Sequence, residues 1–181
     1  MNESTATLMR LLNDCFYAAA VIAIVALPFL IVNFLKCRNK NLSPRNYGKI
    51  TSWPIKSMCF FAIPIMLAIA CADAASSVAR SHVLKVLRSS SGSTTVLING
   101  IPSNKQQEII QVLGAIDSAW AHHSHPTKRI TVEIRSGMDN LVLQLGRDSD
   151  RQQEYWVFFP MYSVTDKNKI GRITTSLFDS Y

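Results

Sequence analysis

Two long apolar stretches, residues 15–35 and 57–72, flank a linker that carries six Lys or Arg residues and no Asp or Glu. Residues 15–35 contain no charged side chain, and a helix of 21 residues is about 31 Å long, which matches the hydrocarbon core of a bilayer. A surface helix of a soluble protein has one polar face, and this segment has none. We therefore predict a transmembrane helix over residues 15–35.

The second stretch is shorter, because only 16 uncharged residues lie between Lys56 and Asp73. Small or weakly polar residues follow, so we expect a second span over residues 57–79, with Asp73 near the lipid headgroups. An alternative is a signal-like segment that is cleaved at Ala72-Asp73-Ala74 or lipidated at Cys71. The complete span before it favours the transmembrane interpretation.

The distribution of Lys and Arg predicts the orientation, because cytoplasmic loops of membrane proteins are enriched in these residues. Residues 1–14 contain one, the linker at residues 36–56 contains six, and the segment just after the second span contains three. We expect an integral protein of the inner or plasma membrane whose linker faces the cytoplasm. Both termini then lie outside the cytoplasm, in the periplasm if the source is a Gram-negative bacterium.

The linker also accounts for most of the net charge of +7, because its own net charge is +6. Nucleic-acid binding is typical of folded domains on which basic residues cluster, so this distribution predicts no nucleic-acid partner. All four cysteines lie at or before position 71, and no two have Cys-x-x-Cys spacing. The domain that follows must therefore depend on an ordinary apolar core and not on disulfides.

The C-terminal part of the chain predicts a small α+β domain. A juxtamembrane helix and a Ser-rich linker at residues 80–93 lead into a domain at residues 94–181. Ser103 and Gln106 form a capping box that begins a helix, and its apolar stripe runs through Trp120. The segments with strand-like patterns are 94–99, 130–135, 141–145, 154–159 and 170–178.

The expected fold class combines these parts. It is a two-helix transmembrane hairpin plus a small α+β domain, in which one helix packs on a four- to five-stranded, mainly antiparallel sheet. The expected order of elements in the domain is β-α-β-β-β-β. We expect this domain and the short N-terminus to be extracytoplasmic.

The densest group of possible metal ligands is His122, His123 and His125, which follow the predicted helix. No acidic residue or cysteine is next to them, so a polar helix end is the competing interpretation. Asp148 and Asp150 are expected to be solvated in a hairpin turn, where flanking arginines keep both ionised. No motif of a nucleophilic or phosphate-binding enzyme is present. We predict no catalytic residue and no cofactor.

The aromatic strand at residues 154–159 is the strongest candidate for a binding surface. Both of its faces carry aromatic side chains, which predicts either a central strand buried on both sides or one face open to a partner. On the second interpretation, Trp156 and Phe158 contact the partner, and Arg135 and Arg172 belong to the polar rim.

These features favour a non-catalytic protein that is anchored in the lipid bilayer and binds another protein through its extracytoplasmic domain. An envelope-complex subunit and an immunity-type inhibitor both fit this description. One alternative is a ligand- or metal-sensing membrane protein that signals through the helix hairpin. Another is an envelope enzyme without a recognisable motif.

Overall fold

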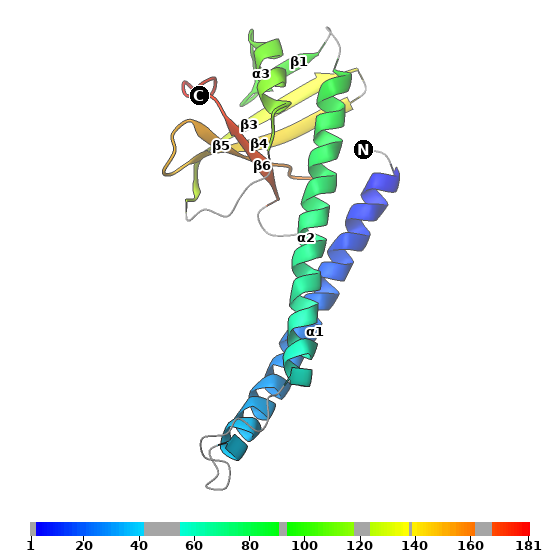
Figure 1. The fold of residues 1–181 in the computed structure, drawn as a ribbon. Helices are drawn as coiled ribbons and strands as arrows, with labels where there is room; N and C mark the ends of the chain where they lie inside the picture. The colour runs from blue at the N-terminus through cyan, green and yellow to red at the C-terminus, as the bar shows by residue number, and fades with distance from the viewer. Residues whose placement is uncertain (1–2, 42–54, 91–93, 118–123, 138, 162–167) are drawn as a thin grey trace. The chain divides into compact units, whose positions relative to one another are not determined.

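The computed structural model describes residues 3–41, 55–90, 94–117, 124–137, 139–161 and 168–181. The chain divides into two compact units. One unit comprises Arg10–Ala74, and the other comprises Met1–Met9 together with Ala75–Tyr181. Figure 1 labels the helices and strands of both units.

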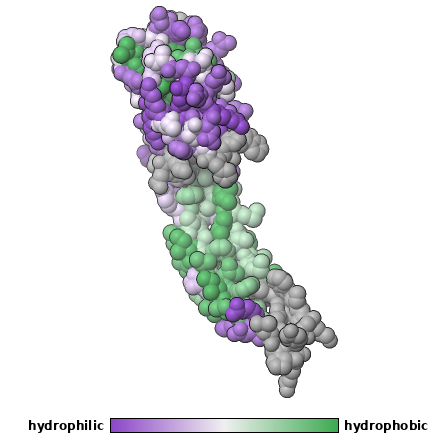
Figure 2. Space-filling view, turned by 90° about the vertical axis from the view of Figure 1, so that its left-hand side faces the viewer, coloured by the Kyte–Doolittle hydropathy of each residue, from purple (hydrophilic) through white to green (hydrophobic). Residues whose placement is uncertain are grey.

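Two long helices, α1 (Glu3–Asn41) and α2 (Ile55–Ser89), contain the predicted spans. Both are long and apolar enough to cross a membrane. Only 17% and 22% of the residues in their most apolar windows are buried, whereas a core helix of a soluble protein is mostly buried. Figure 2 shows the hydrophobic surface that the exposed side chains form. Such a surface is suited to contact with lipid.

The buried apolar side chains of residues 10–74 are small. Among the described residues of this range they are Ala19, Ala23 and Ala26 of α1 and Pro64, Ala68 and Cys71 of α2. Small residues let helix backbones approach closely. Helices inside a membrane associate through such close packing, because the hydrophobic effect does not drive them together there. All four cysteines of the chain lie in this unit, and all are free.

The helix α2 continues without a break beyond the second predicted span. Its last part carries a stripe of buried residues spaced four apart, which are Ala75, Ala79, Val83 and Leu87. The Ser76 hydroxyl donates to the Lys169 carbonyl oxygen at 3.3 Å, and the His82 and Phe159 ring centroids are 6.1 Å apart. Residues 75–89 therefore belong to the domain, and a membrane boundary at residue 79 stays a prediction.

Six antiparallel strands form one sheet in the order β2-β1-β3-β4-β5-β6. The strands are β1 (Thr95–Ile98), β2 (Ile101–Pro102), β3 (Pro126–Ser136), β4 (Asp139–Asp148), β5 (Glu154–Phe158) and β6 (Lys169–Thr174). The predicted α+β layout is confirmed, but the predicted count of four to five strands is wrong. The order of elements is β-β-α-β-β-β-β, and the last strand ends at Thr174 because a turn follows it.

The additional strand β2 follows from a two-residue turn at Asn99 and Gly100. Their φ angles are 51° and 83°, the left-handed conformation that a tight hairpin turn requires. The turn brings Ile101 opposite Ile98 and Pro102 opposite Leu97. A proline is expected to end a strand, but β2 is at the edge of the sheet, where the missing N–H interrupts no ladder.

The helix α3 (Gln106–Leu113) is shorter than predicted. The predicted capping box is absent, because the Ser103 hydroxyl accepts a hydrogen bond from a backbone N–H only two residues later. The helix ends before Gly114, and the chain is extended at Asp117, which pairs with β6. The predicted continuation of the helix through Trp120 lies outside the described residues.

Alternating strand residues build the domain core on one face of the sheet, the core face. They include Val96, Ile98, Ile130, Val132, Ile134, Leu141, Leu143, Leu145, Tyr155, Val157 and Ile173. The helix α3 contacts β1 and β6, and the chain just after it meets the core face at Gly171. A Cβ at Gly171 would overlap the Asp117 carbonyl oxygen and lie 2.5 Å from Ile116 Cγ2. The opposite face of the sheet, the outer face, carries the intervening residues.

Candidate functional site

The outer face carries both predicted aromatic anchors on β5. Trp156 lies between Gly146 of β4 and Arg172 of β6, and Phe158 follows two residues later. The side chains of Trp156 and Phe158 are buried, with exposed fractions of 6% and 3%. The strand β5 is therefore a central strand with buried residues on both faces, which is the first of the two interpretations of its sequence.

Three basic side chains lie over these rings. The Arg172 guanidinium carbon is 4.1 Å from the centroid of the Trp156 ring, and Lys169 Nζ is 4.3 Å from the same centroid. The Arg129 guanidinium carbon is 4.8 Å from the centroid of the Phe158 ring. Each distance is within the range of about 6 Å in which a cation is attracted to an aromatic face. We call these five residues the cation–aromatic cluster.

A carboxylate at Asp148 fixes one end of the cluster. Its Oδ2 accepts hydrogen bonds from Trp156 Nε1 at 2.6 Å and from Ser124 Oγ at 2.7 Å. Its Oδ1 accepts hydrogen bonds from the backbone N–H groups of Asp150 and Arg151 at 2.9 and 3.1 Å. Burial alone would raise the pKa of Asp148, but these hydrogen bonds outweigh it and hold the pKa at about 2. The carboxylate therefore stays ionised and orients the indole.

The prediction that Asp148 is solvated is wrong, because the residue is only 2% exposed. The strand β3 begins at Pro126, directly opposite Asp148. The backbone N–H of Ser149 donates to the His125 carbonyl oxygen at 3.0 Å, which joins the residue before β3 to the turn that follows Asp148. This contact joins parts of the chain that are 24 residues apart. Asp150, in the same turn, is exposed as predicted.

Arg172 is a buried arginine beside two carboxylates. Its Nη1 is 3.2 Å from Glu154 Oε2 and 3.9 Å from Asp148 Oδ2. Its Nε and Nη2 are buried and form no hydrogen bond within the described parts of the chain. The guanidinium lies over the Trp156 ring instead, which stabilises a cation that has lost its water. Arg172 therefore keeps its charge inside the cluster, because a guanidinium does not lose its proton in proteins.

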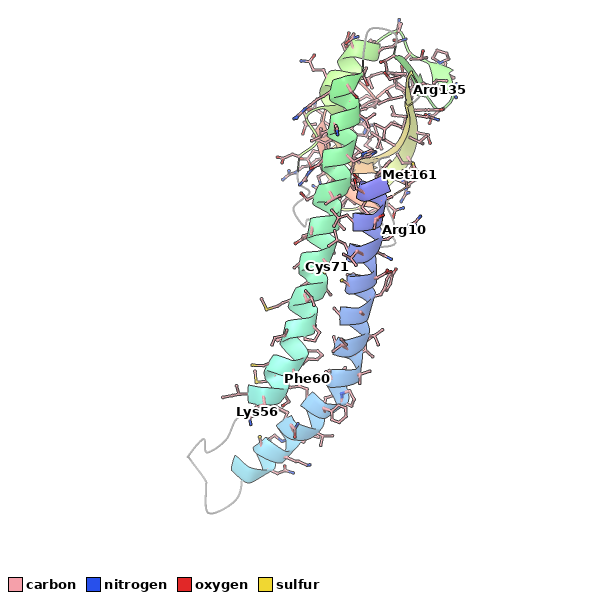
Figure 3. All side chains as sticks on the ribbon, turned by 90° about the vertical axis from the view of Figure 1, so that its right-hand side faces the viewer. Arg10, Lys56, Phe60, Cys71, Arg135 and Met161 are labelled. Carbon is pink, nitrogen blue, oxygen red and sulfur yellow. The ribbon has the colours of Figure 1, made fainter. Side chains whose placement is uncertain are left out.

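The structure brings together three of the four predicted partner-binding residues and places the fourth, Arg135, apart from them. Arg135 lies on β3 beside β1 (Figure 3), where it is exposed, and its Nε is 2.7 Å from Glu133 Oε1. The hydrogen bond from Arg135 lowers the pKa of Glu133 below its usual value. Asn140 donates a second hydrogen bond to the same carboxylate oxygen at 3.1 Å. Arg135, Glu133 and Asn140 lie on the outer face of β1, β3 and the start of β4, which we call the open part of this face.

Sequence reasoning misses Asp148, Arg129 and Lys169, because their place in the site depends on strand register. One signal was present in the sequence, since a glycine inside a strand marks a close approach of another part of the chain. A Cβ at Gly146 would lie 2.6 Å from Pro126 Cβ and 3.2 Å from a ring carbon of Phe158. Gly146 therefore marks the place where the start of β3 and the aromatic strand meet.

The predicted metal ligands His122 and His123 lie outside the described residues, so the metal site stays a prediction. His125 is exposed, and its backbone N–H donates to the Ser149 hydroxyl at 3.2 Å. Within the described ranges, no group of three or more His, Cys, Asp or Glu side chains is arranged to hold a metal ion.

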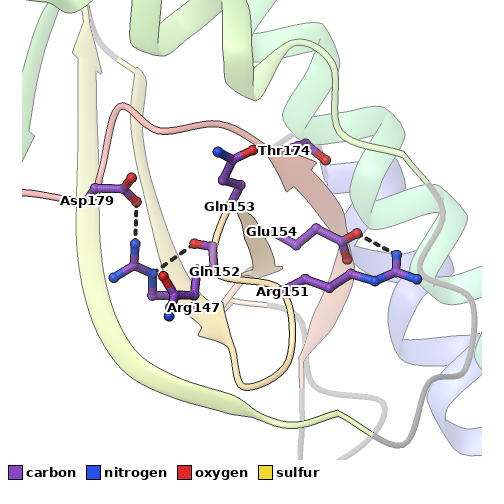
Figure 4. Close-up of a pocket in the computed structure, with 7 residues that line it drawn as sticks. All are labelled: Arg147, Arg151, Gln152, Gln153, Glu154, Thr174 and Asp179. Atoms are coloured by element: carbon purple, nitrogen blue, oxygen red, sulfur yellow. Dashed lines mark hydrogen bonds and ion pairs between the residues drawn. The ribbon is translucent and has the colours of Figure 1, made fainter.

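A shallow polar hollow of about 480 Å³ lies beside the turn between β4 and β5 (Figure 4). It is lined by Arg147, Arg151, Gln152, Gln153, Glu154, Thr174 and Asp179. Its charges pair with one another, because Arg147 Nη2 is 2.6 Å from Asp179 Oδ1 and Arg151 Nη1 is 2.7 Å from Glu154 Oε1. Burial, together with a hydrogen bond of 2.8 Å to Asp179, raises the pKa of Tyr155 to about 12. The hollow therefore has no excess charge with which to attract a ligand.

Comparison of the chain with protein-family models, with curated proteins and with solved structures finds no match in any of the three. The fold defines an α+β domain joined to two helices that are long and apolar enough to cross a membrane. Any function must therefore be argued from the residues of this chain.

Proposed function

We propose that the protein is a membrane-anchored, non-catalytic binding protein. The two apolar helices hold it in the bilayer, and the α+β domain binds another protein through the outer face of the sheet. The orientation predicted from Lys and Arg puts this domain outside the cytoplasm. The partner is then a protein of the cell envelope, and the chain acts as a complex subunit or as an immunity-type inhibitor.

One observation carries this proposal, namely the open part of the outer face. On β1 and β3 the side chains of Thr95, Thr131 and Arg135 are exposed, and Leu97 and Val142 beside them are partly exposed. The core face of the same strands is buried. A surface that mixes polar groups with a few apolar ones is typical of interfaces between proteins that also exist apart.

The cation–aromatic cluster supports this surface from one side. Trp156 and Phe158 are buried, so the residue that meets a partner first is Arg129, which is exposed above the Phe158 ring. The Arg129 Nη1 donates to Gln144 Oε1 at 3.1 Å, which fixes the side chain in place. An arginine that is already ordered loses less conformational entropy on binding, and arginine is enriched among the residues that dominate binding energy.

A photocrosslinking experiment tests the proposal in native membranes. A photoreactive amino acid replaces Thr131, which lies between Arg129 and Arg135 on the outer face, and a control variant carries it at Gln107, which is exposed on α3. We expect a defined protein adduct from position 131 and not from position 107. The charge reversals Arg129→Glu and Arg135→Glu should abolish that adduct.

Charge reversals elsewhere on the domain serve as the matched control. Lys105→Glu and Lys128→Glu change the same number of charges at exposed positions and should leave the adduct in place. An adduct at both positions 107 and 131, or no adduct at position 131, would refute binding through the outer face. Circular dichroism of each purified variant shows whether the domain has kept its fold.

A further inference from the structure

We infer that one end of the helical unit binds the headgroups of anionic phospholipids. The surface consists of Lys36 and Arg38 of α1 and Lys56 of α2, and we call it the basic end. This inference rests on the membrane placement of the two helices, which is part of the proposed function. It does not depend on protein binding by the α+β domain.

The basic end directly adjoins the exposed apolar surface of the helices. The apolar stretch of α1 ends at residue 35, and the helix continues to Asn41 with Lys36 and Arg38 exposed on this extension. Lys56 is exposed in the first turn of α2, and Phe60 one turn later is 59% exposed (Figure 3). A bilayer that covers the apolar side chains therefore brings its headgroups to the level of these cations.

The positive charge at this end has no internal compensation. The sequence from residue 36 to residue 56 contains no Asp or Glu, and three further cations in it are Lys40, Arg45 and Lys49. Neither Lys36, Arg38 nor Lys56 forms an ion pair with any residue that the structure describes.

Four arginines of the α+β domain, unlike the cations of the basic end, are paired with carboxylates. Arg135, Arg147, Arg151 and Arg172 each lie within 4 Å of a carboxylate oxygen of the domain. These four arginines are therefore paired with carboxylates of the domain, whereas no described carboxylate is paired with the cations of the basic end. The phosphate groups of lipid headgroups are the anions that lie beside the end of an apolar span.

The expected preference for anionic lipid follows from simple electrostatics. Each Lys or Arg close to the membrane surface increases the affinity of a protein for an anionic leaflet about fivefold relative to a neutral one. Salt screens this attraction, with a Debye length of about 10 Å at 0.1 M and about 4 Å at 0.5 M. The preference should therefore decrease when the salt concentration rises from 0.1 to 0.5 M.

The full-length protein, reconstituted in phosphatidylcholine vesicles, provides the test. Electron paramagnetic resonance of spin-labelled phosphatidylglycerol and spin-labelled phosphatidylcholine measures how strongly each lipid is immobilised by the protein. The variant carries Lys36→Gln, Arg38→Gln and Lys56→Gln. The control carries the same loss of charge at exposed positions outside the basic end, namely Lys85→Gln, Lys105→Gln and Lys128→Gln.

We expect the wild-type protein and the control to favour phosphatidylglycerol more than about fivefold at 0.1 M salt, and the basic-end variant, which keeps Lys40, Arg45 and Lys49, to favour it at least about fivefold less than they do. A wild-type protein without preference, or a control that loses it equally, overturns the inference. Extraction of native membranes with alkaline carbonate separates this outcome from a failure of the proposed function. Release of the protein by carbonate refutes membrane placement, whereas retention without lipid preference refutes only the role of the basic end.

Discussion

The buried carboxylate of Asp148 makes the unfolding free energy of the domain depend on pH. Its pKa is 3.8 in an unfolded chain and about 2 in the folded protein, a difference of about 1.8 units. At 1.36 kcal/mol per unit, the ionised carboxylate stabilises the fold by about 2.5 kcal/mol relative to its protonated form. A lowered pKa places this stabilisation at pH values above 3.8, and it is lost as the pH falls through 2.

Asp148→Asn keeps the size of the side chain and removes its charge. One oxygen remains for the N–H groups of the turn, but the amide nitrogen then faces the Trp156 Nε1 and Ser124 Oγ donors. A buried donor without an acceptor costs about 1–3 kcal/mol. We therefore expect the variant to lose about 2–4 kcal/mol of unfolding free energy at pH 7.

Urea unfolding of the full chain in a mild detergent, followed by tryptophan fluorescence, measures this loss between pH 7 and pH 2.5. The difference between wild type and variant should be constant from pH 7 to pH 5 and should shrink below pH 4. Asp150→Asn, in the same turn but exposed, should change stability by less than about 0.5 kcal/mol. A difference that does not vary with pH, or an equal effect of Asp150→Asn, would show that the ionised Asp148 is not the source.

Three further substitutions test the packing and the turns, each by urea unfolding of the full chain. Gly171→Ala places a Cβ against the Asp117 carbonyl oxygen and should cost about 1–3 kcal/mol, so an unchanged midpoint would contradict the close approach at β6. Gly100→Ala should cost about 1 kcal/mol through its φ of 83° alone, since no atom lies within 4 Å of the added Cβ. Tyr155→Phe removes the hydrogen bond to Asp179 and should cost about 1 kcal/mol. The pKa of Tyr155 is raised from 10 to about 12, so the neutral side chain stabilises the fold fully below pH 10, and this stabilisation is lost as the pH rises to 12. The Tyr155→Phe variant should not show this loss of stability between pH 10 and pH 12.

Composition and periodicity predict the parts of this fold that depend on local sequence. The uncharged run at residues 15–35 is long enough to indicate a span, and the alternation in β3 and β4 follows from which side chains must be buried. The strand β2 is missed because Pro102 suggests an end, although Asn99 and Gly100 form the pair of residues that favours a two-residue hairpin turn.

The candidate site is less predictable, because it is made by contacts between distant parts of the chain. The aromatic residues of β5 are visible in the sequence, but the burial of Trp156 depends on Arg172 and Lys169 from β6. The burial of Asp148 depends on residues 124–126, which precede it by more than 20 positions. No periodicity connects such positions, so only the register of the sheet reveals them.

The confinement of every cysteine to residues 15–71 separates the folding of the α+β domain from the redox state of its surroundings. The domain needs no oxidative folding catalyst, and a reducing agent cannot unfold it by breaking a cross-link. We therefore expect the domain to adopt the same fold in a compartment that oxidises thiols and in one that reduces them. Its cysteine content therefore does not indicate an orientation, and the predicted orientation depends on the Lys and Arg residues of the linker at residues 36–56 alone.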